Sequence, residues 1–487
     1  MNTIIVSDNL KRLPHTISNI EVISSEVFFT DKKFQRGNVR VVNLCRSYAY
    51  QTAGYYVSLL ASARGQKILP DIETILDVGS KHIIKLRSEH LDDLIQKSFK
   101  ELQTNEFDLS LYFGKNTAKK YDKLCGELNK LFNVPLARAK FRKKDKWILQ
   151  SLKPIGLADV PESHIDILSM FAGEYFQKRQ ATRKLKTARF DLAILVNDKE
   201  AQPPSNEKAL KNFLKSANRL EIDVEFISKG DFHRIPEFDG LFIRETTEVN
   251  HHTFRFAQRA KSLGLAVIDD PLSILRCTNK VYLAELFEKN GVSAPKTTLV
   301  YREDFDKNSL HFNFPLVAKL PDSSFSKGVV KIHDKAELAS TFSDMFETSE
   351  VILTQEFIPT EFDWRIGILA GEAIYACKYF MARAHWQIYN HSANGKIEDG
   401  AAETMSINEA PEKVVALALK AAKLIGKGLY GVDIKEKNGK LYVIEVNDNP
   451  SIDAGCEDLY LGQTLYDKIM LFLRDQMEKI AMGRALL

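Results

Sequence analysis

The chain has 487 residues, of which 44% are hydrophobic and 27% charged, and its formal net charge at pH 7 is +4. This length and composition exclude a membrane protein, because nowhere do about 18 uncharged apolar residues follow one another, and the amino-terminal apolar run is too short for a signal peptide. The 5 cysteines are scattered without a CxxC pair and indicate neither a disulfide framework nor a zinc site. We therefore expect a cytoplasmic protein of about three globular domains, with no membrane partner.

The first 150 residues alternate apolar runs with a helical pattern. Residues 3–6 and 39–44 are predicted strands, and residues 54–65 are a predicted helix that ends at a glycine. We interpret residues 1–150 as an α/β domain. The tyrosines that cluster around Arg46 could form a ligand surface, but aromatic stripes more often belong to a core, and we favour the core.

The middle of the chain is basic. Residues 115–189 hold 18 Lys and Arg against 7 Asp and Glu, with dense runs at residues 141–146 and 177–189. Such runs can contact RNA, but they are more often solvated faces, and we favour the solvated face. Residues 151–189 are predicted to form a basic helical connector.

Residues 190–275 show strands alternating with helices, which predicts a small parallel sheet. Ser205 is positioned to cap the first helix of this domain. The ligand crevice of a parallel sheet lies at the carboxyl ends of its strands. Arg244 lies near the carboxyl end of the predicted strand at residues 238–245. It is therefore a candidate for binding substrate, and the alternative is a surface charge.

From Lys280 onward the sequence carries features suited to phosphate. Lys280 begins an amphipathic helix, Lys319 lies on an apolar strand, and a polar loop follows that contains Ser326, Lys327 and Gly328. Backbone N–H groups of such a loop can surround phosphate oxygens while lysines neutralise their charge. The alternative is a hairpin loop with surface lysines, since the loop lacks the P-loop pattern.

Residues 351–371 predict two strands joined by an acidic link. The end of the first strand can offer backbone donors and acceptors to an adenine ring through Gln355, Glu356, Phe357 and Ile358. Asp363 is positioned to hold ribose hydroxyls, and Arg365 shares its face. The segment that follows supplies three further polar candidates, Lys378, Arg383 and Asn390.

A hairpin near the carboxyl end predicts a metal site. Glu445 and Asn447 lie two residues apart on an apolar strand and therefore face one side, and Asp433 lies on the preceding strand. Carboxylate and amide oxygens suit Mg²⁺, which takes further ligands from phosphates and water. The alternative is a strand end with ordinary solvated acids.

The turn of this hairpin, Asn438-Gly439, poses a problem of register. A regular two-residue turn would point Asp433 away from Glu445. We therefore predict a three-residue turn at residues 437–439 with Gly439 in the left-handed conformation, which sets Asp433 opposite Val443.

Residues 426–431, GKGLYG, match the dinucleotide-binding pattern GxGxxG literally. That pattern requires a strand before it and a helix after it, whereas here a predicted helix precedes and a predicted strand follows. We therefore predict a helix stop and a turn.

The order and spacing of these motifs resemble the RimK-type ATP-grasp ligases, relatives of glutathione synthetase, from about residue 190 to the carboxyl end. Residues 1–150 resemble the amino-terminal domain fused to some RimK-like ATP-grasp proteins. The resemblance implies an α/β (α+β ATP-grasp) fold: the amino-terminal domain, a pre-ATP-grasp domain at residues 190–275, and a two-lobed ATP-grasp domain at residues 276–487. The lobes are expected at about residues 276–350 and 351–487.

The resemblance also implies roles for the candidate residues. Lys280 and Lys319 would bind ATP phosphates, the strand end at residues 355–358 would line the adenine pocket, and Asp363 would touch ribose. Two Mg²⁺ ions, with Mn²⁺ as an alternative, would be held by Asp433, Glu445 and Asn447. The acyl phosphate and the substrate carboxylate would be handled by Arg365, Lys378 and Asn390. Apart from the resemblance, Arg244 at its strand end and Arg383 are candidates for binding substrate. Residues 383–400 depart from the arginine-rich family segment.

The implied activity is ATP-dependent ligation of a carboxylate to an amine through an acyl phosphate, with glutamate or another amino acid as a candidate substrate. The partners are then small molecules or peptides, a protein acceptor being an alternative, and we expect a homo-oligomer that does not bind nucleic acid. Two other hypotheses stay open: a phosphoryl-transfer enzyme without ligation, and an ATP-regulated module that binds nucleic acid or the ribosome through the basic middle.

Overall fold

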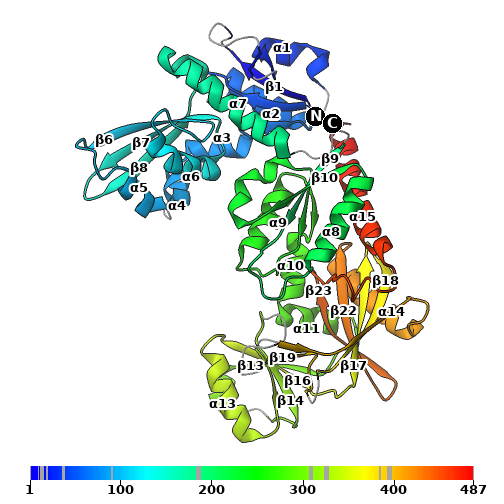
Figure 1. Cartoon of the computed structure of the whole chain (residues 1–487). Coiled ribbons are helices and arrows are strands. Elements are labelled where there is room, and N and C mark those ends of the chain that lie inside the picture. The colour runs from blue at the N-terminus through cyan, green and yellow to red at the C-terminus, as the bar shows by residue number, and fades with distance from the viewer. Residues whose placement is uncertain are drawn as a thin grey trace. The chain divides into compact units, whose positions relative to one another are not determined.

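The computed structural model describes residues 2–8, 10, 16–17, 20–35, 39–88, 91–182, 188–306, 311–322, 328–382, 385–391 and 397–485. The chain divides into two compact units (Figure 1). The amino-terminal unit comprises Met1–Asp191, Gly230–Asp239 and Gln476–Leu487, and the carboxyl-terminal unit comprises Leu192–Lys229 and Gly240–Asp475. Within the described residues, no helix has both the length and the apolar character required to cross a bilayer.

The amino-terminal unit contains two sheets. The first has the order β2-β3-β1-β4-β5, with β1 parallel to β3 and β4. Its strands are β1 (Asn2–Ser7), β2 (Thr16–Ile17), β3 (Ile20–Ser24), β4 (Val39–Asn43) and β5 (Lys67–Leu69). It packs with α1 (Ser25–Thr30), α2 (Ala53–Ala63) and α7 (Ile165–Thr182). The predicted strands at residues 3–6 and 39–44 and the predicted helix at residues 54–65 are confirmed.

The second sheet is antiparallel and has the order β6-β7-β8. Its strands are β6 (Glu106–Tyr112), β7 (Leu136–Lys143) and β8 (Trp147–Pro154). Four helices accompany them and share their core: α3 (Ile72–Gly79), α4 (Lys81–Ser88), α5 (Asp92–Ser98) and α6 (Asp122–Phe132).

The segment predicted to be a helical connector differs from that prediction. Its first residues belong to β8, and α7 buries Leu168, Phe171 and Phe176 in the core of the first sheet. The segment is polar in composition, but one stripe of α7 is apolar, and packing of that stripe makes the helix part of the unit. The tyrosine cluster divides, since Tyr48 is buried while Tyr50 is exposed.

The basic run at residues 141–146 lies at the tip of the β7–β8 hairpin. Arg142, Lys143 and Lys144 are exposed, and Arg142 Nε lies 3.6 Å from the exposed carboxylate of Glu106. Exposed pairs of this kind contribute little to stability. Replacing all three by Gln should change the free energy of unfolding by less than about 1 kcal/mol and leave catalytic rates unchanged. Urea denaturation and steady-state kinetics test this; loss of activity only on a macromolecular acceptor would instead identify an anion-docking surface.

The carboxyl-terminal unit begins with a four-stranded sheet of order β10-β9-β11-β12, in which β11 is parallel to β9 and β12. The strands are β9 (Phe190–Leu195), β10 (Ile222–Ile227), β11 (Gly240–Ile243) and β12 (Ala266–Ile268), and the helices are α8 (Glu207–Arg219), α9 (His252–Ser262) and α10 (Pro271–Thr278). The predicted parallel sheet is confirmed. The predicted cap is wrong, because Asn206 accepts the Ala209 N–H and caps α8 while Ser205 donates to Ile452 O.

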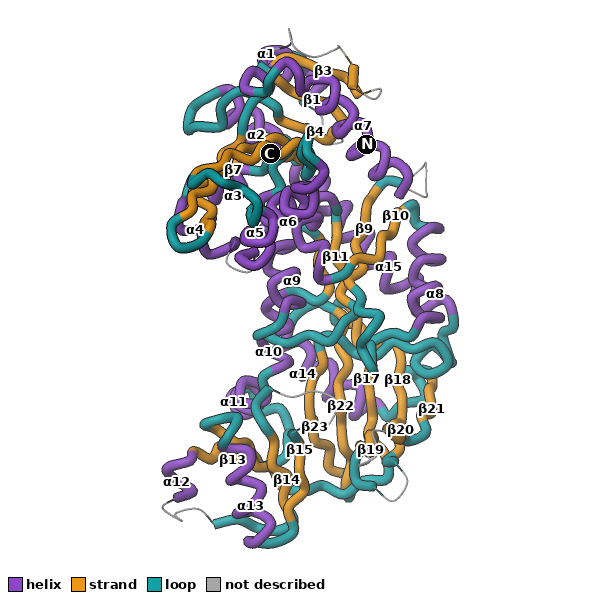
Figure 2. The backbone as a smooth tube through the Cα atoms, turned by 60° about the vertical axis from the view of Figure 1, so that its left-hand side comes forward, coloured by secondary structure: helices purple, strands orange, loops and turns teal. Residues whose placement is uncertain are grey.

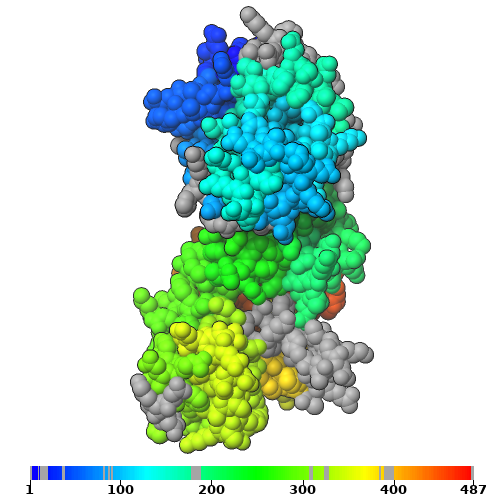
Figure 3. Space-filling model, turned by 90° about the vertical axis from the view of Figure 1, so that its left-hand side faces the viewer, coloured from blue at the N-terminus to red at the C-terminus, as the bar shows by residue number. Residues whose placement is uncertain are grey.

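A small lobe follows, built on an antiparallel sheet of order β13-β16-β14-β15. Its strands are β13 (Thr297–Tyr301), β14 (Leu316–Lys319), β15 (Val329–Ile332) and β16 (Val351–Glu356), and its helices are α12 (Arg302–Asp306) and α13 (Lys335–Phe346). The helix α11 (Lys280–Lys289) precedes this lobe in the chain but buries Leu283 and Phe287 in the core of the large lobe. Leu338, Phe342, Met345 and Phe346 of α13 pack on the sheet. The small lobe lies in the yellow-green part of the space-filling view (Figure 3).

The large lobe is a sheet of order β21-β18-β17-β22-β23, whose long strands lie side by side in Figure 2. Its strands are β17 (Phe362–Leu369), β18 (Glu372–Phe380), β21 (Ala402–Met405), β22 (Leu429–Lys437) and β23 (Lys440–Asn447). A small ribbon pairs β19 (Tyr389–His391) with β20 (Ile397–Asp399), and two helices complete this part of the chain, α14 (Glu412–Ile425) and α15 (Gln463–Ala485).

Residues 426–431 stop a helix and turn, as predicted. The helix α14 ends at Ile425, Gly426 follows it, and β22 begins at Leu429. The GxGxxG match therefore has no relation to dinucleotide binding.

The β22–β23 hairpin solves the register problem differently from the prediction. Lys437 pairs with Lys440 across a two-residue turn in which both Asn438 (φ 51°) and Gly439 (φ 73°) are left-handed, so the predicted three-residue turn is wrong. A β-bulge at Ile444 restores the register further along: Ile434 pairs with Val443, and Asp433 pairs with Glu445.

Gly439 needs the left-handed conformation, although nothing lies within 4 Å of where its Cβ would be. Gly439→Val should therefore lower the free energy of unfolding by about 1–2 kcal/mol through backbone strain alone. Gly439→Asn is the matched control and should cost less, because Asn tolerates this region better. Equal stability of the Val variant and the wild type in urea denaturation would contradict the turn assignment.

Candidate active site

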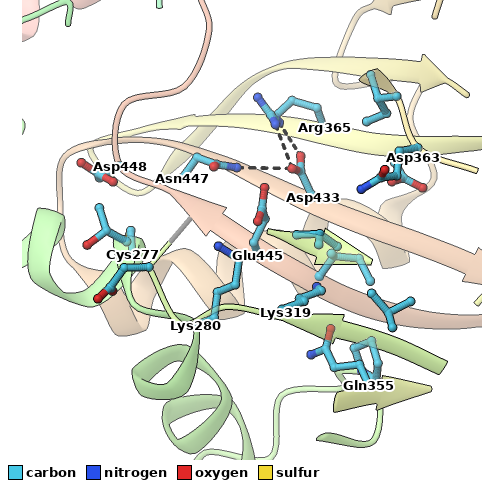
Figure 4. Close-up of a pocket in the computed structure, with 18 of the residues that line it drawn as sticks. Cys277, Lys280, Lys319, Gln355, Asp363, Arg365, Asp433, Glu445, Asn447 and Asp448 are labelled. Carbon is cyan, nitrogen blue, oxygen red and sulfur yellow. Dashed lines mark hydrogen bonds and ion pairs between the residues drawn. The ribbon is translucent and has the colours of Figure 1, made fainter. Parts of the chain in front are cut away.

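A cavity of about 400 Å³ opens in the carboxyl-terminal unit. Its walls come from the loops after β11 and β23, the start of α11, the small-lobe sheet and the pocket face of the large-lobe sheet (Figure 4). It brings together the predicted catalytic residue Arg365 and most of the residues predicted for nucleotide and metal binding: Lys280, Lys319, Gln355, Glu356, Phe357, Ile358, Asp363, Asp433, Glu445 and Asn447.

Two lysines reach the cavity, one from the small-lobe sheet and one from the start of α11. Lys319 ends β14 and is 7% exposed, and burial lowers its pKa to about 8, against the influence of Glu445. Burial also lowers the pKa of Lys280, which begins α11. Burial acts to raise the pKa of Glu445, but the two lysines outweigh it, so this pKa lies below its ordinary value. Figure 4 shows Glu445 between the lysines and Asp433.

Strand pairing places the next polar group. Arg365 of β17 pairs with Asp433 of β22, which pairs with Glu445 of β23, so all three side chains share the pocket face. Arg365 donates to both carboxylate oxygens of Asp433, from Nε and, at 2.8 Å, from Nη2. Gly431 makes room for this arginine, because a Cβ there would lie 2.8 Å from Arg365 Cδ.

The oxygen donors at this hairpin fit a hard divalent cation. Asn447 Nδ2 donates to Asp433 Oδ2 at 3.3 Å, so the amide of Asn447 and the carboxylates of Asp433 and Glu445 lie close together on the sheet, and rotation of the amide would turn its carbonyl oxygen toward the same point. Burial raises the pKa of Asp433 to about 6 although Arg365 opposes the shift, so a cation bound beside this carboxylate would stabilise its ionised form. This donor set suits Mg²⁺ or Mn²⁺.

The strand end at residues 355–358 forms a partly apolar wall. The Phe357 ring lies 3.9 Å from Lys331 Nζ and contacts the Trp386 ring edge-on at 5.8 Å. Val317, Val329 and Ile444 line the cavity as well. A flat base fits such a wall, since ring faces and β-branched side chains exclude water while backbone groups give direction.

Asp363 is held by two neighbours. It accepts from Lys435 Nζ at 2.6 Å and from Thr360 Oγ1 at 3.0 Å. Lys435 was not among the predicted site residues, although the period of two from Asp433 along the same strand places it on the pocket face.

Two other predicted residues that the structure describes, Lys378 and Gly328, do not line the cavity. Lys378 pairs with Glu403 at 3.4 Å and stacks over the rings of Phe362 and Trp364, and Gly328 is absent from the lining. Of Asn390 only the backbone, in β19, is described. Ser326, Lys327 and Arg383 lie outside the described residues.

The predicted substrate contact of Arg244 is wrong. This residue is 1% exposed, and its guanidinium donates to Ser205 Oγ (3.0 Å), Asn449 Oδ1 (2.6 Å), Pro450 O (2.9 Å) and Pro204 O. Its donors are therefore used to join the loop after β23 to residues 204–205. The position at a strand end was identified correctly, but the loops that cover it could not be read from local sequence.

Residues that the sequence analysis passed over form the remaining wall: Thr246, Thr247, Glu248, Val249, Asn250, Cys277, Thr278, Asp448, Asn449 and Ser451. Asp448 accepts from Thr247 Oγ1 at 2.8 Å, and burial raises its pKa to about 7. The position of Asp448 directly after Asn447, in the polar turn that ends the strand, is the sequence feature that could have identified it as a cavity residue.

Comparison with known proteins decides the family. Residues 277–470 match the RimK-like ATP-grasp domain, and residues 25–170 match the RimK-like ATPgrasp N-terminal domain. This chain belongs to the RimK-like ATP-grasp family. As a member it is an ATP-dependent ligase that forms carbon–nitrogen bonds, and the predicted family, fold class and enzyme class are confirmed.

Several curated proteins that are similar to this chain are named as ligases. A probable alpha-L-glutamate ligase of Vibrio atlanticus (strain LGP32) is 26% identical over 264 residues, which cover 52% of this chain and 84% of the relative. One of Legionella pneumophila (strain Corby) is 23% identical over 224 residues, covering 45% and 71%. Among solved structures, D-alanine–D-alanine ligase from Bacillus anthracis complexed with ATP aligns with a TM-score of 0.46 and 19% identity, covering 60% of this chain and 98% of that chain.

Proposed function

We propose that the cavity of this RimK-like ATP-grasp protein binds ATP with two Mg²⁺ ions and joins a carboxylate to the amine of an amino acid through an acyl phosphate. The observation that supports the proposal is that three kinds of functional group line one cavity. Lys280 and Lys319 supply positive charge, the hairpin supplies hard oxygen ligands, and Arg365 supplies a planar fork of donors.

ATP would lie with its base against the wall at residues 355–358 and its ribose near Asp363. Asp363 is an acceptor that could bind ribose hydroxyls, and the hydrogen bond from Lys435 orients its carboxylate. The triphosphate would then extend toward Lys280 and Lys319. Burial destabilises the charged form of both lysines and so lowers their pKa values. A polyanion beside them would stabilise the charged form again, so its binding is strongly favoured.

The phosphoryl group moves to the substrate carboxylate, forming an acyl phosphate and ADP. Asp433, Glu445 and Asn447 would hold the Mg²⁺ ions, which neutralise charge on the transferred group when bound. Asp433 can serve both a cation and Arg365, since a carboxylate offers about four acceptor sites.

Amide formation follows when the amine attacks the acyl carbon and inorganic phosphate leaves. Arg365 would donate to the tetrahedral oxyanion, and such preorganised donors typically accelerate acyl transfer. No protein nucleophile is required. Of the described lining residues, the one thiol is Cys277, whose pKa is raised by burial and by Asp448, so it stays protonated.

The amine substrate would enter at the end formed by residues 246–250, 277–278 and 448–451. The described side chains that line this end include Glu248 and Asp448 but no arginine or lysine. An ammonium group is complementary to such a wall. The names of the glutamate ligase relatives make an α-amino acid the first candidate.

The test is mass spectrometry of products after incubation of the enzyme, ATP and Mg²⁺ with a panel of amino acids and peptides. We expect ADP release that depends on the amine. We also expect a product whose mass equals the mass of the carboxylate substrate plus that of the amine, less one water. Omission of either substrate is the control.

Phosphorylated product without amide, at any amine concentration, would support the phosphoryl-transfer hypothesis instead. RNA binding that weakens steeply with salt, together with an absence of amide product, would support the nucleic-acid hypothesis.

A further inference from the structure

The segment after β11 carries a second set of ligand atoms that the ligase chemistry does not use. One carboxylate oxygen of Glu245 and one ring nitrogen each of His251 and His252 all lie within 4.8 Å of one another. Glu245 is 3% exposed and both histidines are partly buried. None of the three lines the cavity, whereas residues 246–250, which lie between them in the chain, do.

Hydrogen bonds orient two of these ligands. Glu245 Oε1 accepts from Asn197 Nδ2 at 3.0 Å, which leaves Oε2 to face the histidines. His251 Nδ1 lies 3.0 Å from Thr253 Oγ1, and that hydroxyl donates to Thr246 O at 3.4 Å. If the Thr253 hydroxyl donates to Thr246 O, it can accept from His251 Nδ1–H, and the lone pair of this imidazole would then be on Nε2. Ligating histidines in metalloproteins are fixed in this manner, by a hydrogen bond from the nitrogen that does not bind the metal.

The spacing is close to that of a metal centre. A tetrahedral ion with bonds of roughly 2.0–2.2 Å needs ligand atoms about 3.3–3.6 Å apart. His252 Nε2 now lies 2.9 Å from Glu245 Oε2, and the widest separation in the set is below 4.8 Å, so small side-chain rotations would reach this geometry. A cation would replace the proton that His252 and Glu245 share.

We propose that Glu245, His251 and His252 form a binding site for a zinc ion, with water as the fourth ligand. Two imidazoles and one carboxylate favour Zn²⁺ over Mg²⁺, which prefers oxygen. The amino-terminal end of α9 opposes a bound cation, and the buried carboxylate of Glu245 offsets this. The ion would close the loop at residues 246–250 at both ends and so hold one wall of the cavity in place.

The test uses the full chain carrying Asp433→Asn, in excess Mg²⁺, so that the oxygen ligands of the hairpin do not take up zinc. Zn²⁺ is titrated against a chromophoric chelator. We expect one equivalent to bind, and the added double substitution His251→Gln/His252→Gln to weaken binding by about 100-fold or more. His333→Gln, at an exposed histidine, is the matched control and should bind zinc as before.

Two further readouts separate ligation from folding. Co²⁺ in place of Zn²⁺ should give the intense visible absorption of a tetrahedral site in the parent and not in the double variant. Zinc should raise the unfolding temperature of the parent only, and His251→Gln alone serves if the double variant does not fold. Zinc affinity unchanged by these substitutions, or no binding in the Asp433→Asn parent, would overturn the proposal.

Discussion

Lys319→Ala is expected to lower the rate of amide formation by about 10²–10³-fold or more, because it removes a preorganised positive charge from the place where phosphoryl charge moves. The variant should fold, since Lys319 makes its contribution through charge at the end of β14 and Leu316 and Ala318 of that strand remain in the core. The measurement is amine-dependent ADP release at saturating ATP, with circular dichroism to verify the fold.

Lys335→Ala is the matched control, because Lys335 is exposed at the start of α13 in the same lobe. It should retain the wild-type rate. If folded Lys319→Ala protein released ADP at the wild-type rate, the phosphate assignment would be wrong.

Asp433→Asn is expected to lower the catalytic rate by a similar factor at millimolar Mg²⁺ and to move the metal dependence to higher concentrations. The substitution removes a carboxylate that pairs with Glu445 across the hairpin and leaves Arg365 without its charged acceptor. Activity measured against Mg²⁺ and Mn²⁺ concentration tests this, and higher metal concentration should restore part of the rate.

Glu436→Gln is the control on the same strand. The Glu436 carboxylate pairs with Lys413 at 2.5 Å, away from the cavity. The activity of the Glu436→Gln variant should therefore depend on metal concentration as that of the wild type does. An unaltered metal dependence in Asp433→Asn protein would remove Asp433 from the metal site.

The sequence by itself determined the local parts of the site. Period two placed Glu445 and Asn447 on one face, the Asn438-Gly439 pair marked a hairpin, and the helix-before-strand order excluded a dinucleotide site at residues 426–431. These inferences succeeded because each depends on backbone geometry within a few residues.

The register of the metal hairpin was decided by the tertiary structure. Val443 and Val446 both lie in the core against α14, although residues three apart on a regular strand face opposite sides. The bulge at Ile444 satisfies this packing and also turns Glu445 toward Asp433. Local sequence could not show the bulge, because the bulge depends on how Val443 and Val446 pack against α14.

Burial decided the remaining differences. Arg244 ends its strand as predicted, but loops distant in the chain cover it and take its donors, so it became structural. The cavity wall at residues 246–250 and the adjoining Glu245–His251–His252 set likewise became visible only in three dimensions. Sequence fixes which groups a strand end carries, whereas the free energy of packing decides which of them face a ligand, because buried donors must find partners wherever the fold provides them.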